Sequence, residues 1–154
     1  MVWFSMIRNL KMSISLVLFI ALSGCLNAKK INLQVNSSNI LNRSDTGDSL
    51  PVRMRVYQLN SVQKFNNVRF EEIWADDIKA LEDSMLTKEE FTIVPGKSRS
   101  IFINSMKDAK YIGVMAAFRD IQEKHWKYVA DINQSVFSKK IQLLVKENNI
   151  LEKE

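Results

Sequence analysis

The sequence has few of the residues on which small catalytic and metal-binding domains depend. Its 154 residues include one cysteine, one histidine, two prolines and four glycines. A zinc site needs a cluster of His and Cys ligands, and a phosphate-binding loop needs closely spaced glycines, so neither is available. The single histidine, His125, follows the polar run Gln122-Glu123-Lys124, and we interpret it as a solvated turn residue. No nucleophile motif surrounds any serine, and the sequence predicts neither an enzyme nor a cofactor.

A strong excess of one charge is also absent. The net charge is +5, and two of the positive charges, Arg8 and Lys11, belong to the first 24 residues, so the remainder carries about +3. Lysines are spread along the chain without arginine or aromatic clustering, which argues against nucleic acid as a partner. Asp76 and Asp77 lie among other carboxylates, but adjacent residues of a helix point about 100° apart. We therefore predict no metal site there, and we expect Asp77 to accept hydrogen bonds from backbone or arginine.

Long apolar runs are missing, apart from one short segment near the amino terminus. Ile14–Leu22 is almost wholly apolar over nine residues, whereas a transmembrane helix needs roughly 20. Positive charges precede this segment and small residues follow it, which is the order typical of a secretory signal. We therefore assign residues 1–24 to a signal peptide that is removed.

The residues at the predicted cleavage point, Leu22-Ser23-Gly24-Cys25, resemble the lipobox of bacterial lipoproteins. The resemblance implies that the Cys25 thiol receives diacylglycerol and that Cys25 then becomes the fatty-acylated first residue. An ordinary signal peptide beside a chance cysteine is the alternative. Lipidation consumes the only thiol, so no disulfide can form. In enteric-type sorting an aspartate after the cysteine retains a lipoprotein in the inner membrane, so Leu26 implies the outer membrane, with the domain facing the periplasm.

A short tether separates the lipidation site from the first predicted strand. Within the tether, residues 25–30, the five residues Leu26–Lys30 span at most about 17 Å, so Lys29 and Lys30 either meet lipid headgroups or are merely solvated. Ile31–Asn36 then alternates apolar and polar residues, as a half-buried strand does. The polar stretch Asn36–Leu50 is long for a hairpin connection, and loops of that length tend to be functional or disordered.

Further strands and one helical insertion follow. The strand signals lie at Val52–Leu59, Phe91–Ile93, Ile101–Ile103, Tyr111–Phe118, Trp126–Ile132 and Ser135–Val145. Between about residues 61 and 83 the period becomes helical, and the apolar residues of Phe70–Leu81, Ile78 among them, share one face. Val94-Pro95-Gly96-Lys97 suits a type II turn. The sequence therefore predicts a mainly β protein: a two-sheet antiparallel β-sandwich over residues 31–146, with a small helical insertion and a charged tail at 147–154 that frays.

Aromatic and charged residues within the periodic segments are interpreted structurally. The large aromatic residues are expected in the core rather than on a stacking platform: Tyr57, Trp74, Tyr111 and Trp126. Arg119-Asp120 is interpreted as a local ion pair that closes a strand end.

The ordered set of these segments resembles one known family, the type VI secretion outer-membrane lipoproteins called TssJ. The resemblance rests on Val52-Arg53-Met54-Arg55-Val56-Tyr57-Gln58-Leu59, Trp74-Ala75-Asp76-Asp77, Phe91-Thr92-Ile93-Val94-Pro95-Gly96, Tyr111-Ile112-Gly113-Val114 and Ala117-Phe118-Arg119-Asp120. Together with the lipobox, these motifs cover most of the mature chain. The resemblance implies a transthyretin-like β-sandwich.

The resemblance also implies a function. A TssJ-like chain is an outer-membrane lipoprotein that assembles the membrane core complex of a type VI secretion system by docking the periplasmic part of the inner-membrane TssM protein. In the family the contact is made largely by the loop joining the first two strands, which here gives the partner-binding residues Asn39, Ile40, Leu41, Asn42 and Arg43. The apolar pair Ile40-Leu41 either folds back onto the sandwich or anchors the partner, and Arg43 can pair with a carboxylate. This function involves no small-molecule substrate; a periplasmic lipoprotein that binds a ligand or glycan is the alternative.

Overall fold

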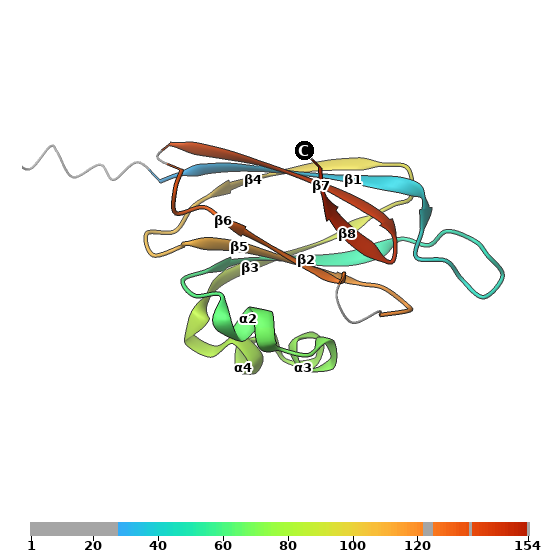
Figure 1. Ribbon diagram of the computed structural model, residues 1–154, viewed down its shortest axis with the longest axis horizontal. Helices are drawn as coiled ribbons and strands as arrows, with labels where there is room; N and C mark the ends of the chain where they lie inside the picture. Colours follow the sequence, from blue (N-terminus) through green and yellow to red (C-terminus); the bar gives the residue numbers. More distant parts are fainter. Residues whose placement is uncertain (1–27, 122–124, 136, 154) are drawn as a thin grey trace, which may run out of the picture.

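The structure, a computed structural model, describes residues 28–121, 125–135 and 137–153 (Figure 1). The predicted signal peptide, residues 1–24, and the predicted lipidation site Cys25 lie outside these residues. Within the described ranges, no helix combines the length and the apolar character that crossing a bilayer requires.

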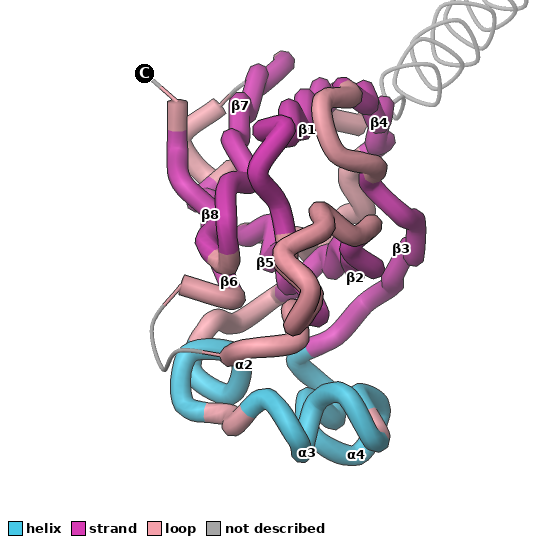
Figure 2. The backbone as a smooth tube through the Cα atoms, turned by 90° about the vertical axis from the view of Figure 1, so that its right-hand side faces the viewer, coloured by secondary structure: helices cyan, strands magenta, loops and turns pink. Residues whose placement is uncertain are grey.

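Eight strands in the described part of the chain form two four-stranded sheets that face each other (Figures 1 and 2). The first sheet has the order β4 (Ser98–Asn104), β1 (Lys30–Leu41), β7 (Ser138–Glu147) and β8 (Asn149–Glu152). The second has the order β3 (Met85–Ile93), β2 (Val52–Leu59), β5 (Tyr111–Ala117) and β6 (Lys127–Asp131). The predicted two-sheet β-sandwich is confirmed. The first sheet is mixed rather than purely antiparallel, because β1 and β7 run parallel from Lys30, which pairs with Ser138.

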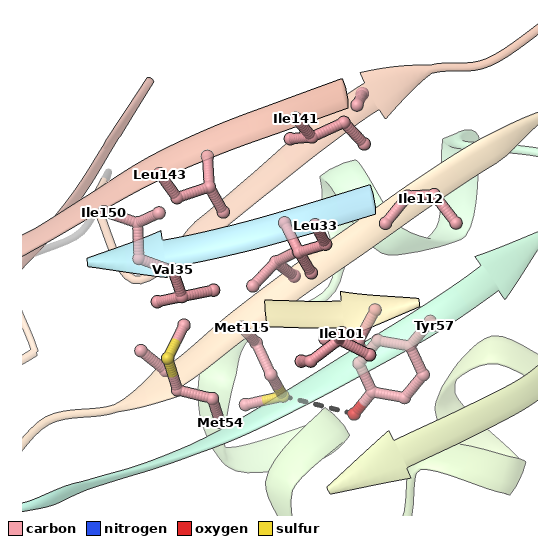
Figure 3. Close-up of a cluster of buried hydrophobic side chains, with 14 of the residues drawn as sticks. Leu33, Val35, Met54, Tyr57, Ile101, Ile112, Met115, Ile141, Leu143 and Ile150 are labelled. Atoms are coloured by element: carbon pink, nitrogen blue, oxygen red, sulfur yellow. Dashed lines mark hydrogen bonds between the residues drawn. The ribbon is translucent and has the colours of Figure 1, made fainter. Parts of the chain in front are cut away.

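The core lies between the two sheets and follows the period-two pattern of the sequence. In β1 the side chains of Ile31, Leu33 and Val35 are buried, whereas the residues between them are partly exposed. Figure 3 shows Leu33 and Val35 facing residues of the second sheet, where the Tyr57 hydroxyl lies 3.2 Å from Met115 Sδ. Burying an aliphatic side chain of this size contributes about 1.5–3 kcal/mol, so this layer holds the two sheets together.

The turn between β3 and β4 has the geometry that the sequence predicts. Gly96 has a φ of 68°, the left-handed conformation that a type II turn requires at its third position. The Lys97 N–H donates to the Val94 carbonyl at 3.1 Å. The turn is also fastened to β1, because the Ser37 N–H donates to the Lys97 carbonyl and the Gly96 N–H donates to the Ser38 carbonyl.

The helical insertion, which is described in full, contains three short α-helices and a 3-10 turn rather than one amphipathic helix. These are α2 (Gln63–Asn67), α3 (Phe70–Ala75), α4 (Asp77–Leu81) and η2 (Glu82–Ser84). The helix predicted over Phe70–Leu81 breaks at Asp76, whose non-helical backbone lets its carboxylate accept a hydrogen bond from the Lys79 N–H at 3.0 Å. This cap starts α4 in a new direction. The prediction that Ile78 lies on the buried face is therefore wrong, and its side chain is 67% exposed.

The aromatic residues interpreted as core divide into two groups. Tyr57 and Trp126 are buried, whereas Trp74 and Tyr111 are partly buried and pack against the edge of the core. The Trp74 ring lies 4.2 Å from the guanidinium carbon of Arg55, so it carries a cation–π contact as well as apolar packing.

A buried carboxylate fastens the helical insertion to the second sheet. Asp77 is 3% exposed and accepts hydrogen bonds from Lys88 Nζ at 2.7 and 2.8 Å and from Arg55 Nη1 at 3.2 Å. The Tyr57 hydroxyl lies 3.3 Å from the same carboxylate. Burial, together with that negative charge, raises the pKa of the Tyr57 phenol well above its ordinary value, so the hydroxyl stays protonated and can donate. The expectation that Asp77 accepts a hydrogen bond from an arginine is confirmed.

The carboxy-terminal segment forms strand β8 where the sequence predicts a fraying tail at 147–154. Its residues pair with the end of β7, and Ile150 is buried. The Ile150 N–H also donates to the His125 carbonyl at 2.8 Å. Glu147, at a left-handed φ of 54°, turns the chain into this strand. The charged composition of this segment predicts a tail, but the buried side chain of Ile150 makes it part of the core.

Candidate functional site

The connection between β1 and β2 lies at the end of the sandwich opposite the predicted tether. β1 begins at Lys30 and runs for 12 residues before the chain enters this connection. At about 3.3 Å per residue, the strand separates its two ends by roughly 36 Å. Figure 1 shows residues 42–51 projecting beyond the strands at the end far from Lys30. We call this end, formed by residues 39–51, 94–97 and 118–121, the last being the segment after β5, the tether-distal end.

The connection is shorter than the sequence predicts, because β1 is longer. The polar residues after Asn36 continue as strand to Leu41, where the pattern predicts a loop from Asn36 to Leu50. Ser37 pairs with Val145 of the parallel strand β7, and on its other side it binds the β3–β4 turn. Neighbouring segments thus supply the backbone partners of residues whose own β-propensity is low.

The remaining connection is closed by its own hydrogen bonds. Arg43 and Ser49 form an antiparallel bridge at its base. Beyond the bridge, the Ser44 N–H donates to the Asp48 carbonyl at 2.8 Å, and Gly47, at a φ of 88°, donates its N–H to the Ser44 carbonyl at 2.9 Å. These contacts give the connection a defined shape outside the apolar core.

Two of the predicted partner-binding residues are structural instead. Leu41 is fully buried, and Asn42 is 4% exposed at a left-handed φ of 46°, which asparagine adopts more readily than most residues. The Asn42 side chain accepts a hydrogen bond from the Arg119 N–H at 2.7 Å and donates to the Pro51 carbonyl at 3.2 Å. Of the two alternatives for the apolar pair, Leu41 folds back onto the sandwich. We therefore remove Leu41 and Asn42 from the candidate docking surface.

Three of the predicted residues reach the surface of the tether-distal end: Asn39, Ile40 and Arg43. Ile40 is 39% exposed. The β3–β4 turn adds Val94, which is 47% exposed and which sequence reasoning missed. The Ser37 hydroxyl donates to the Val94 carbonyl at 2.6 Å, so the segments that carry the two apolar side chains are joined. Val94 could have been found from alternation, because the preceding residue Ile93 points into the core.

Arg119 reaches the connection rather than its neighbour in sequence. The predicted ion pair with Asp120 is wrong; Arg119 Nη2 lies 3.0 Å from the carboxylate of Asp45. Both side chains are largely exposed, and a surface pair of this kind contributes about 0–1 kcal/mol. The pair matters for position rather than stability, because it holds the segment after β5 beside the candidate docking surface.

The chemistry of this end suits recognition of another macromolecule. In the described ranges, no three His, Cys, Asp or Glu side chains are grouped as a metal site requires. His125 is exposed, as the sequence predicts. At the tether-distal end, the exposed apolar side chains of Ile40 and Val94 lie on the same surface as the Asn39 amide and the Arg43 guanidinium. Backbone hydrogen bonds fix the segments that carry them. Apolar side chains with polar neighbours are the usual composition of a protein-binding surface.

Comparison with solved structures defines the class of protein. The TssJ1 lipoprotein of the type VI secretion system (T6SS) of Pseudomonas aeruginosa matches with a TM-score of 0.74 and 20% identity, over 82% of this chain and 98% of that chain. Lip of Serratia marcescens, a membrane-bound component of the type VI secretion system, gives 0.77 and 20%, over 82% and 97%. A chain of a structure described as a type VI membrane complex gives 0.76 and 22%, over 82% and 99%. The fold is that of the type VI secretion lipoproteins.

The family follows from the sequence itself. Residues 29–148 match the family model T6SS-SciN, described as type VI secretion lipoprotein, VasD, EvfM, TssJ. The chain belongs to this family. Membership confirms the resemblance inferred from the motifs and decides for a secretion lipoprotein over a ligand- or glycan-binding one. The family is a structural component of a secretion system, so the prediction that the chain is not an enzyme is also confirmed. No curated protein matches the chain significantly.

Proposed function

We propose that the mature chain is held in the outer membrane by a lipid on Cys25 and docks the periplasmic part of an inner-membrane TssM protein through its tether-distal end. The observation that carries this proposal is that the tether and the exposed connection lie at opposite ends of the domain. The tether enters at one end of β1 and the exposed connection leaves at the other, roughly 36 Å away. A partner that extends from the inner membrane meets the tether-distal end first.

The choice of partner has support from a further likeness. A chain in a structure described as the TssM C-terminal domain of the T6SS from EAEC shares the fold, with a TM-score of 0.73 and 20% identity. The match covers 82% of this chain and 98% of that chain. That description concerns the other protein. For this chain it supports TssM as the partner class that the family resemblance implies.

The exposed residues supply the usual elements of an interface. Ile40 and Val94 can enter apolar pockets of the partner, Arg43 can pair with a carboxylate, and the Asn39 amide can donate and accept. A few such anchors usually carry most of the binding free energy. The buried residues Leu41 and Asn42 hold these side chains in place from beneath.

If Ile40 contacts the partner, a single substitution at this position should weaken binding strongly. Ile40→Asp places a charge on the apolar contact, and we expect it to weaken binding to the purified periplasmic part of the co-encoded TssM about tenfold or more. Ile78→Asp is the matched control, because Ile78 is exposed on the helical insertion. Calorimetric titration measures both. Equal affinities of the two variants would place the contact elsewhere.

The lipid anchor predicts that fatty-acid incorporation depends on one residue. Cys25→Ser removes the nucleophile, so the chain should incorporate no fatty-acid analogue in metabolic labelling and should not support secretion. Each buried methylene contributes about 0.8 kcal/mol of anchoring, so several acyl chains hold the protein permanently. If wild type and Cys25→Ser label equally, the lipidation site is not Cys25.

A further inference from the structure

The end of the sandwich next to the tether is assembled from three segments that are hydrogen-bonded to one another. These are residues 28–30, the β4–β5 connection 105–110 and, from the β6–β7 region, residues 131–135 and 137–140. The Ser105 N–H donates to the Lys29 carbonyl at 2.8 Å, and Lys29 Nζ donates to the Ile132 carbonyl at 3.0 Å. We call this surface the tether-proximal end.

Positive charge is concentrated at the tether-proximal end. Its three segments contain six lysines and two aspartates: Lys29, Lys30, Lys107, Lys110, Lys139 and Lys140 against Asp108 and Asp131. The nearby carboxylates Glu82 and Asp83 are already paired with Lys64, at 2.8 and 2.7 Å. At the tether-distal end the described charges balance, with Arg43, Lys97 and Arg119 against Asp45, Asp48 and Asp120. The domain therefore has one basic end and one neutral end.

Exposed apolar side chains accompany these lysines. Phe102 is 77% exposed, Phe137 is 74% exposed and Met106 is 45% exposed. Phe102 pairs with Asn32 across the sheet, and Asn32 pairs with Lys140 on its other side, so an aromatic ring and a lysine share one row. Large apolar side chains gathered at one surface mark a contact with another apolar phase.

The backbone of Phe137 is hydrogen-bonded to the first strand close to the tether. The Lys30 N–H donates to the Phe137 carbonyl at 3.0 Å. A phenylalanine next to a lysine is the combination that lies well at a bilayer surface, where the ring enters the headgroup region and the ammonium group meets phosphate. Neither group has an evident role in the packing of the sandwich.

We propose that the tether-proximal end is a membrane-contact surface that sits on anionic phospholipid headgroups. Phe102, Met106 and Phe137 enter the interface, and the surrounding lysines bind the phosphates. The inference rests on the proposed lipid anchor at Cys25, because a tether of at most about 17 Å keeps this end at the bilayer. The contact holds β1 upright on the membrane. The tether-distal end then points away from it, toward the partner.

The test uses the single thiol of the mature chain. Residues 25–154 contain one cysteine, so this chain, produced without the predicted signal peptide and therefore with a free thiol, can be coupled at Cys25 to a maleimide lipid in vesicles. Phe137→Trp and Ile40→Trp place an indole at exposed sites on opposite ends of the domain. In phosphatidylglycerol vesicles with brominated acyl chains, we expect added quenching for Phe137→Trp and none for Ile40→Trp. Trp74 and Trp126 give both variants the same background.

Two results would overturn the proposal: no added quenching of Phe137→Trp, or equal quenching of both variants, which would mean that the domain lies flat. A second arm tests the charge with uncoupled protein. Lys107→Glu with Lys110→Glu should reduce sedimentation with phosphatidylglycerol vesicles about tenfold, whereas Lys97→Glu should not. Equal binding to phosphatidylcholine vesicles would contradict headgroup recognition. Neither arm contains TssM and the anchor is synthetic, so their failure is distinct from failure of docking or lipidation.

Discussion

Replacing the tip of the β1–β2 connection by a two-residue turn should weaken docking more than about tenfold and leave the sandwich intact. The change joins Arg43 directly to Ser49 through Asn-Gly, a sequence that suits a tight turn between antiparallel residues. The replaced residues, 44–48, begin after Arg43, because Leu41 and Asn42 are buried and their loss would damage the core. Closing a loop of half the length changes the entropy term by only about 0.6 kcal/mol. We expect the melting temperature to change by no more than a few degrees.

Binding should respond quite differently from stability. The shortened chain loses the Arg119–Asp45 pair, which contributes about 0–1 kcal/mol, and the formed surface that faces the partner. We expect affinity for the periplasmic part of TssM to fall by more than about tenfold. If the shortened protein binds normally while Ile40→Asp does not, recognition is confined to the end of β1 and the β3–β4 turn. If both bind normally, the docking surface is elsewhere.

Most strands could be predicted from the sequence, because burial of one face of a strand makes apolar and polar residues alternate. Ile31, Leu33 and Val35 alternate with polar residues, and this pattern is determined by which face of the strand meets the core. The end of β1 was not predictable in the same way. Residues 36–38 are polar, and they are strand because β7 and the β3–β4 turn, which are distant in sequence, provide their backbone partners.

The same long-range pairing limited the prediction of the site. Had the alternation been continued through residues 36–40, Leu41 would have pointed inward with Val35, and Ile40 outward, as the structure has them. The parallel pairing of β1 with β7 cannot be predicted from either segment alone, because its register depends on both strands. The break at Asp76 was hidden for another reason: a helix pattern shows which residues share a face and does not show where a side-chain cap interrupts it.

Asp77→Ala should be the most destabilising change outside the apolar core. It leaves the Arg55 guanidinium and the Lys88 ammonium without the carboxylate that now accepts from both. Removing one member of a buried ion pair typically costs about 3–5 kcal/mol. Here Lys88 can turn to water and Arg55 keeps its bond to Glu90 at 2.8 Å, so we expect about 2–3 kcal/mol. This corresponds to a fall in melting temperature of roughly 10 °C.

Asp76→Ala is the matched control for Asp77→Ala, since it removes the same charge from the adjacent position. Asp76 caps α4 by accepting from the Lys79 N–H, and loss of such a cap costs about 1 kcal/mol. A second variant isolates the unpaired lysine: adding Lys88→Met to Asp77→Ala should recover part of the lost stability, because the replaced ammonium no longer lacks a counter-ion. Thermal melts of wild type, Asp77→Ala, Asp76→Ala and the Asp77→Ala, Lys88→Met double variant measure these differences in stability. If Asp77→Ala is no less stable than Asp76→Ala, the ion pairs of Asp77 contribute no more to stability than the cap of α4, and the attachment of the helical insertion depends on other contacts, such as the buried side chains of Phe65, Ile73 and Leu81.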